Sequence, residues 1–167
     1  LTAPFVGIFG LNDYATRASA ATFGVLNVIV IFFLARMFFK SDSLGLIASF
    51  FLAVSPFNLQ FSRFNHELNF AIFFFTAGVY FFYKALNGKF KFLIPAFLLL
   101  GIDLLTYQSA KVVTPVLVFL LIVLNFKKLL NNKKYFFSGL VIYLFFVSLL
   151  FIKPELLGGE RLKQNKI

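Results

Sequence analysis

The feature that most constrains this chain is a succession of hydrophobic runs, each approaching the ~20 residues that a helix needs to cross the hydrocarbon core of a bilayer. Short polar or basic breaks, such as Lys40-Ser41-Asp42-Ser43 and Asn87-Gly88-Lys89, separate the runs. About six spans are predicted, at 18–39, 44–61, 68–86, 90–109, 112–126 and 135–152. The expected fold class is all-α, a polytopic bundle of transmembrane helices within residues 18–152.

The composition supports lipid rather than water as the solvent. Hydrophobic residues make up 60% of the chain and charged residues only 13%, whereas soluble domains have about half apolar and a quarter charged residues. A soluble chain of this size could not cover so much Phe and Leu with polar side chains.

The two ends of the chain differ from the hydrophobic runs. Residues 1–17 contain Pro4, Gly7 and Gly10 and are predicted to form an extracytoplasmic loop or an interfacial helix. Residues 153–167 are expected to be a truncated extracytoplasmic tail. The chain starts at Leu1 without the pattern of a signal peptide, so a fragment of a longer protein is expected.

The net charge of +10 lies at the ends of the apolar runs and not in one basic groove. This placement is typical of membrane insertion and argues against a nucleic-acid partner. Alternate loops differ: one set carries nine basic residues with Asp42 as its only acid, and the other carries seven basic residues and five acids. The more basic set is predicted to be cytoplasmic, which places Arg63 and Glu67 on the outer side.

Several kinds of chemistry are excluded or disfavoured by the residue types. The chain has no Cys and a single His, so thiolate sites are excluded and a transition-metal site is not expected. It also contains no glycine-rich phosphate loop, nucleophile elbow or zinc-helix motif. No cofactor is indicated apart from a divalent cation that a carboxylate could bind.

The first polar cluster with a chemical use is Arg63, His66 and Glu67. If the chain is helical from Arg63 onward, these three side chains share one face. A guanidinium can hold a phosphate through paired hydrogen bonds, and Glu67 could bind an acceptor hydroxyl or a cation. The alternative is an ordinary helix start, with Asn65 as the N-cap, Glu67 in the first turn and Arg63 at the interface.

The second cluster consists of Asp103, Tyr107 and Lys111, spaced four residues apart. On one helix they would form a polar stripe that faces the protein interior, because a lipid-facing stripe is unfavourable. The alternative is a structural ladder in which Asp103 accepts a hydrogen bond from Tyr107. Arg17, close to the first span, is either an interfacial anchor or a further cationic group for a ligand.

The same residues carry a family resemblance. The stretch from Gly10 to Gly24, the pair Ser55-Pro56, the pair Ser62-Arg63 followed by Glu67, and the segment Thr106–Lys111 with Pro115 follow one another at family-like spacing. From about Pro4 to Phe126 the chain resembles the GT-C glycosyltransferases, which include bacterial relatives of protein O-mannosyltransferases and the aminoarabinose transferases. Lys111 stands where the family has an arginine.

The resemblance implies an inverting transfer of a sugar from a polyprenyl-phosphate donor to a protein, lipid A or glycan acceptor outside the cell membrane. It implies that Arg63, Lys111 and Arg17 bind the donor phosphate, that Glu67 and His66 bind the acceptor or a cation, and that Asp103 and Tyr107 line the pocket. The family's essential acidic residue is expected upstream of Leu1, so the catalytic base is unknown and this fragment alone is expected to be inactive.

Three other classes remain open on the residues alone. A transporter or channel would use the same polar groups to line a substrate path, with inverted repeats and broken helices at mid-membrane. A membrane scaffold would need no charge at Asp103. A polymerase or ligase of lipid-linked glycans would share much of the same chemistry.

Overall fold

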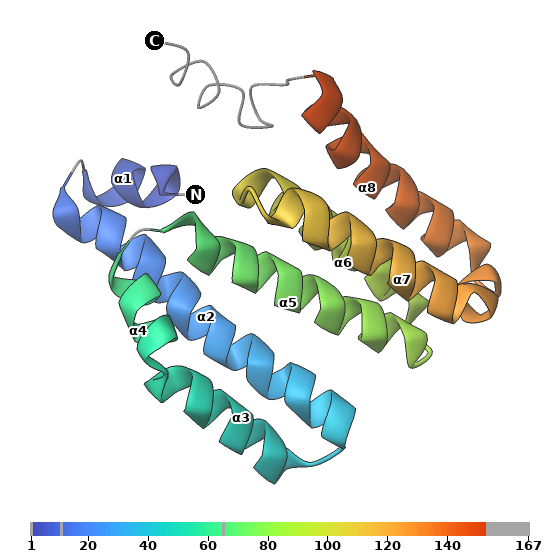
Figure 1. The fold of residues 1–167 in the computed structure, drawn as a ribbon, viewed down its shortest axis with the longest axis horizontal. Helices are drawn as coiled ribbons and strands as arrows, with labels where there is room; N and C mark the ends of the chain where they lie inside the picture. Colours follow the sequence, from blue (N-terminus) through green and yellow to red (C-terminus); the bar gives the residue numbers. More distant parts are fainter. Residues whose placement is uncertain (1, 11, 65, 153–167) are drawn as a thin grey trace. The chain divides into compact units, whose positions relative to one another are not determined.

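The computed structural model describes residues 2–10, 12–64 and 66–152, and its regular elements there are all helical. The expected tail at 153–167 lies outside the described residues. The chain divides into two compact units, Leu1–Tyr80 and Phe81–Ile167, and each is described by itself. Figure 1 shows the helices in chain order, with α5 running through the boundary between the units.

The first unit contains α1 (Ala3–Phe9), α2 (Asp13–Phe39), α3 (Asp42–Val54), α4 (Pro56–Arg63) and most of α5 (Glu67–Leu86). Thus part of the segment 1–17 is a short helix and part already belongs to α2. Ser41 begins α3 as an N-cap whose side chain accepts a hydrogen bond from the Leu44 N–H.

Helices α3 and α4 return antiparallel along α2. Near the C-terminal end of α2, the Arg36 Nε lies 2.6 Å from an Asp42 carboxylate oxygen, across the turn into α3. Near its N-terminal part, Gly24 contacts Ser62 of α4. Small residues allow such close approach of helix backbones, which is the usual means of packing helices in lipid.

Helix α5 packs along α2 in the parallel sense. Phe23 of α2 meets Phe70 and Phe73 edge-to-face, at centroid distances of 4.7 and 5.2 Å. Buried amides join the same pair of helices, because the Asn27 Nδ2 donates to the Asn69 Oδ1 at 2.8 Å. The interior of this unit therefore holds polar contacts as well as aromatic ones.

The second unit contains the end of α5, the 3₁₀ turn η1 (Phe90–Phe92), α6 (Leu93–Thr106), α7 (Ala110–Leu130) and α8 (Lys133–Ile152). Gly88, with φ +94°, makes the turn that leads from α5 to η1. Lys84 of α5 places its ammonium 4.6 Å from the centre of the Phe92 ring, so a cation–π contact covers this turn.

Helices α6 and α8 form the centre of the second unit and run parallel. Gly139 of α8 receives the ring of Phe97. One turn further along α6 and two turns further along α8, Gly101 of α6 receives the ring of Phe146. The two glycines leave room for two rings, so the helices interlock through reciprocal small–large pairs. Leu93, Leu100, Leu104, Val118 and Leu121 complete the apolar part of the core around them.

Four described helices are long and apolar enough to cross a membrane, and the bent pair α3–α4 is a fifth candidate. This confirms an all-α polytopic membrane protein, although about six spans were predicted. The difference lies at α6, which has fourteen residues because Tyr107 is extended (φ −142°, ψ 147°) and ends the helix. The residues assigned to the end of the fourth span instead form a turn before α7.

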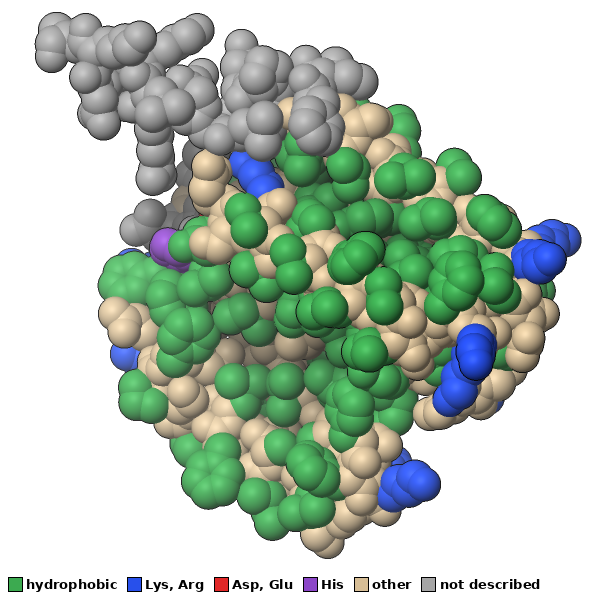
Figure 2. All heavy atoms as spheres, turned by 45° about the vertical axis from the view of Figure 1, so that its right-hand side comes forward, with side chains coloured by type: hydrophobic (Ala, Val, Ile, Leu, Met, Phe, Trp, Pro, Cys, Tyr) green, Lys and Arg blue, Asp and Glu red, His purple; other side chains and the backbone are tan. Residues whose placement is uncertain are grey.

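Large hydrophobic side chains cover much of the described surface, as the green side chains of Figure 2 show. On α7 they include Val112, Val116, Phe119, Val123 and Leu124. In water such a face would be an aggregation site, whereas in a bilayer it meets acyl chains without cost.

Candidate functional site

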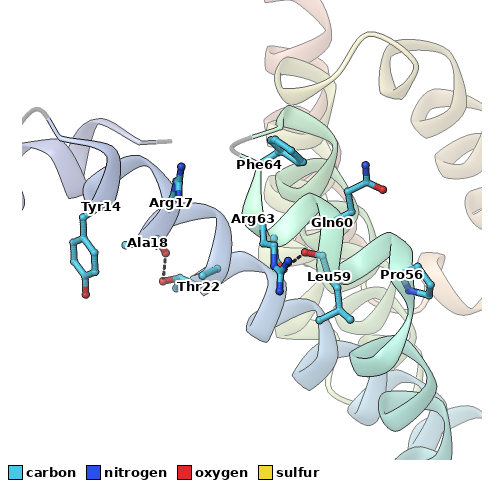
Figure 3. Close-up of a pocket in the computed structure, with 11 residues that line it drawn as sticks. Tyr14, Arg17, Ala18, Thr22, Pro56, Leu59, Gln60, Arg63 and Phe64 are labelled. Atoms are coloured by element: carbon cyan, nitrogen blue, oxygen red, sulfur yellow. Dashed lines mark hydrogen bonds between the residues drawn. The ribbon is translucent and has the colours of Figure 1, made fainter.

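A pocket of about 1170 Å³ opens in the first unit between the N-terminal part of α2 and α4. Figure 3 shows the side chains that the two helices contribute to it. Its lining residues are Tyr14, Arg17, Ala18, Ala21, Thr22, Pro56, Leu59, Gln60, Ser62, Arg63 and Phe64. The site residues predicted at Arg17 and Arg63, forty-six positions apart in the chain, are thus brought to one pocket.

Local sequence explains how each wall is built. On α2, Arg17, Ala18, Ala21 and Thr22 recur at helical spacing and so face the same way. On α4, Pro56 sits at the first helical position, where its missing N–H costs nothing, and Leu59 and Arg63 follow on the same face.

The pocket combines two cationic side chains with several apolar lining residues. Arg17 and Arg63 are both exposed, no acid occurs among the lining residues, and neither guanidinium has an acidic partner among the described side chains. In the view of Figure 3 the Arg17 side chain extends upward and the Arg63 side chain downward between the helices. An anion entering this pocket would meet two guanidinium groups that the described protein has not already neutralised.

Tyr14 and Gln60 are among the polar lining residues that were missed at the level of sequence. Each stands three residues before a predicted cationic residue, Tyr14 before Arg17 and Gln60 before Arg63. Helical spacing was therefore the signal that could have found them.

The expectation that Arg63, His66 and Glu67 share one helix face is wrong. Helix α4 ends at Arg63, Phe64 is extended (φ −92°, ψ 132°), and α5 begins only at Glu67. The alternative of a helix start fits better, since Glu67 lies in the first turn of α5. Asn65, the expected N-cap, lies outside the described residues; the His66 Nδ1 accepts a hydrogen bond from the Leu68 N–H at 3.1 Å.

The expectation of one helical stripe through Asp103, Tyr107 and Lys111 is also wrong. Asp103 lies on α6, Tyr107 is the extended residue after it, and Lys111 lies in the first turn of α7. The Lys111 Nζ donates to the Gln108 Oε1 at 3.0 Å. These three residues belong to the second unit, so their placement at the same cavity as Arg63 stays a prediction.

Asp103 faces the interior, as expected, but its partner is not Tyr107. Only 1% of the residue is exposed, and its Oδ2 accepts a hydrogen bond of 2.5 Å from the Thr114 hydroxyl of α7. Its Oδ1 and the buried hydroxyl of Tyr143 have no hydrogen-bond partner among the described residues. The geometry favours a role in joining helices, because the bond from Thr114 to this carboxylate connects α7 to α6.

Among the described residues no three His, Asp or Glu side chains come together as a metal site would require. The pocket that contains Arg17 and Arg63, here called the arginine pocket, could hold an anion. Its lining residues include no carboxylate that would bind a cation.

Comparison with known proteins identifies the family of the chain. No curated protein and no solved structure matches the chain. The family model described as dolichyl-phosphate-mannose-protein mannosyltransferase matches residues 1–152, which is most of the chain and includes every described helix. A bundle of membrane helices that carries a cationic pocket near their ends is consistent with that match, and the chain belongs to the dolichyl-phosphate-mannose-protein mannosyltransferase family of GT-C membrane glycosyltransferases.

Proposed function

We propose that the full-length protein transfers a sugar from a polyprenyl-phosphate-linked donor to a glycan, lipid or protein acceptor. The donor phosphate binds in the pocket between α2 and α4. The observation that carries this proposal is the pairing of Arg17 and Arg63 in one pocket that has no acid in its lining.

The chemistry of the pocket fits a lipid phosphate better than a free sugar. A guanidinium offers a planar fork of N–H donors that matches the oxygens of a phosphate. Pro56, Leu59 and Phe64 supply an apolar wall next to these donors, and Phe57 and Leu59 of α4 are exposed where acyl or prenyl chains would lie. A ligand with a charged head and an apolar tail satisfies both surfaces.

Other residues have proposed roles that rest on the family match and on their position in the chain. Glu67, exposed at the start of α5 and four residues after Arg63, is proposed to orient the acceptor or a divalent cation, with His66 beside it. Lys111, at the start of α7, is proposed as a further cationic group for the donor phosphate, and Tyr107 and Asp103 as residues near it. No residue of this chain is proposed as the catalytic base.

The active side is proposed to be extracytoplasmic. Helix α5 is long enough to span and carries Glu67 at one end and Lys84 at the other. Lys89 and Lys91 follow the Lys84 end of α5, and further lysines lie at the end of α7 and the start of α8. Such clusters of lysine are typical of a cytoplasmic face. The Glu67 end, with Arg63 just before it, is then on the outer face of the cell membrane.

The test is donor turnover by full-length protein reconstituted in liposomes, with Arg63→Ala and Arg63→Lys. Loss of a charge-assisted pair costs about 1.5–3 kcal/mol, so Arg63→Ala is expected to lower kcat/KM for the lipid-linked donor by about 10- to 100-fold. Arg63→Lys is expected to retain part of the activity, because lysine keeps the charge but cannot bind in a bidentate manner.

Arg36→Ala provides the matched control. Arg36 is an exposed arginine on the same helix as Arg17, but at the opposite end, where Asp42 already pairs with it. Loss of an exposed ion pair costs about 0–1 kcal/mol, so donor turnover is expected to stay at the wild-type level. Wild-type turnover in both Arg63→Ala and Arg17→Ala would show that this pocket does not bind the donor.

A further inference from the structure

The two helices that line the arginine pocket come close together at Gly24 of α2 and Ser62 of α4. A Cβ placed on Gly24 would stand 2.6 Å from the Ser62 Cβ and 3.7 Å from the Ser62 Cα. Ordinary van der Waals contact begins near 3.4 Å. A Cβ is fixed to its backbone, so rotation of the serine side chain cannot relieve this clash.

This contact is in register with both arginines. Gly24 follows Arg17 by seven residues, which is two helical turns along the same face, and Ala21 of the pocket lies between them. On the other wall, Ser62 is the residue before Arg63 and lines the pocket itself. The separation of α2 and α4 at Gly24 and Ser62 therefore sets the separation of the walls that carry the two guanidinium groups.

Helix α2 is also held by buried amide hydrogen bonds to α5. The Asn69 Nδ2 donates to the carbonyl oxygen of Ala20 at 2.7 Å, and the Asn27 Nδ2 donates to the Asn69 Oδ1 at 2.8 Å. Both asparagines are 1% exposed, and buried polar groups that lose such partners are costly. An added atom at Gly24 is therefore accommodated by displacement of α4, the short helix after the Pro56 break, rather than of α2.

We infer that Gly24 and Ser62 are positioning residues, whose combined size fixes the width of the arginine pocket so that Arg17 and Arg63 bind one phosphate together. This inference rests on the proposed function. The two residues touch no substrate; they act through the helices that carry the arginines.

The test is a size-exchange experiment with full-length protein in liposomes, using Gly24→Ala, Ser62→Gly and the double variant. Gly24→Ala improves helix propensity, so a purely local effect would be neutral or stabilising. Because misplacement by about 1 Å can cost roughly 100-fold in rate, Gly24→Ala is expected to raise the KM for the lipid-linked donor roughly 10-fold or more. The KM for the acceptor is expected to stay unchanged.

The double variant Gly24→Ala/Ser62→Gly adds a methyl group to one wall and removes the hydroxymethyl group from the other, which restores the space between the helices. Its donor KM is expected to return to within about threefold of the wild-type value, a coupling that independent sites would not show. Gly7→Ala is the matched control, because Gly7 lies in α1 and nothing approaches the position of its Cβ within 4 Å. A donor KM in Gly24→Ala that equals the wild-type value, or a double variant no better than the single one, would overturn the inference.

A second measurement does not depend on folding of Gly24→Ala. The chain has no cysteine, so the pair Gly24→Cys/Ser62→Cys can be oxidised and then probed with a thiol reagent. A disulfide needs Cβ atoms about 3.5–4.5 Å apart, and the two positions are closer than that. A small outward shift of α4 is therefore enough for the bond to form, and this pair is expected to be protected after oxidation. The pair Gly24→Cys/Phe50→Cys, with Phe50 exposed on α3, is expected to stay reactive, and equal reactivity of the two pairs would contradict the contact itself.

Failure of the proposed function and failure of this inference give different results. If Arg63→Ala and Arg17→Ala bind farnesyl phosphate as tightly as wild type, the phosphate site is wrong whatever Gly24→Ala does. If the arginine variants lose binding and Gly24→Ala keeps it, only the positioning role is wrong.

Discussion

Asp103 is buried in a helix core at a place where a soluble protein would rarely put a carboxylate. Its bond to Thr114 joins α6 to α7. Hydrogen bonds between membrane helices satisfy polar groups that lipid cannot solvate. At the scale of the residue, we therefore interpret Asp103 as a group that links the helices of the second unit.

This interpretation predicts that Thr114→Val is destabilising although it changes little in volume. The variant leaves a buried carboxylate oxygen without its partner, which costs about 1–3 kcal/mol. The cost is expected to fall in an Asp103→Leu background, with a coupling of about 0.5–3 kcal/mol. Unfolding of the purified protein in mixed micelles measures both values.

Thr106→Val is the control for this comparison of single and double variants. The Thr106 hydroxyl donates a hydrogen bond within its own helix, to the Ile102 carbonyl oxygen at 2.9 Å. A Thr114→Val variant as stable as Thr106→Val, with no coupling to Asp103, would remove the linking role.

The sequence predicted that Asp103 faces inward, because a lipid-facing charge is costly. It could not identify Thr114, since that contact depends on how α7 folds back along α6.

At the scale of the element, the break at Ser55-Pro56 determines where Arg63 lies. The residue before a proline is driven away from the helical region, and Ser55 accordingly adopts φ −61° and ψ 129°. Helices α3 and α4 meet there at 56°. The sequence predicted this bend, because proline acts locally.

The sequence predicted separate spans on either side of 62–67 and of 110–111. It did not predict that helices end inside the two polar clusters, at Arg63 and at Thr106. No proline enforces these helix ends, and the spacing of Arg63 with Glu67 and of Asp103 with Lys111 is compatible with a continuous helix. Helical spacing is necessary for a shared face but not sufficient for one. The family resemblance grouped Arg17 with Arg63 at one phosphate, whereas helical spacing alone could not show which residues face each other across the pocket.

Pro56→Ala is expected to straighten the α3–α4 pair. Leu46 and Phe64 are exposed and stand nine residues on either side of Ser55. At 1.5 Å per residue they would be roughly 27 Å apart in a straight helix and roughly 24 Å apart with the observed bend. Spin labels at these two positions are therefore expected to report an increase of about 3 Å in Pro56→Ala. A distance unchanged from the parent protein would show that tertiary packing, and not proline, maintains the break.

At the scale of the whole molecule, the arrangement of charge in the second unit agrees with a membrane-spanning chain. Several lysines of this unit lie in the turn after α5 and in η1, in the last turn of α7, and in the first turn of α8: Lys89, Lys91, Lys127, Lys128, Lys133 and Lys134. The hydrophobic faces of α7 and α8 lie between these lysines and the opposite ends of the helices. Sequence alone predicted this alternation, since insertion responds to hydrophobicity and to basic flanks rather than to tertiary contacts.

The orientation gives a direct test on α7, which has twenty-one residues and basic residues only near its C-terminal end apart from Lys111. Single cysteines replace Ser109 before the helix and Asn131 after it, both exposed residues in a chain that has no native cysteine. The Ser109→Cys variant is expected to react with a membrane-impermeant maleimide in intact cells, and Asn131→Cys only after the cells are permeabilised. Reaction of both thiols from the same side would mean that α7 does not cross the bilayer. Reaction of Asn131→Cys alone from outside would invert the orientation and place the start of α7, with Lys111, on the cytoplasmic face.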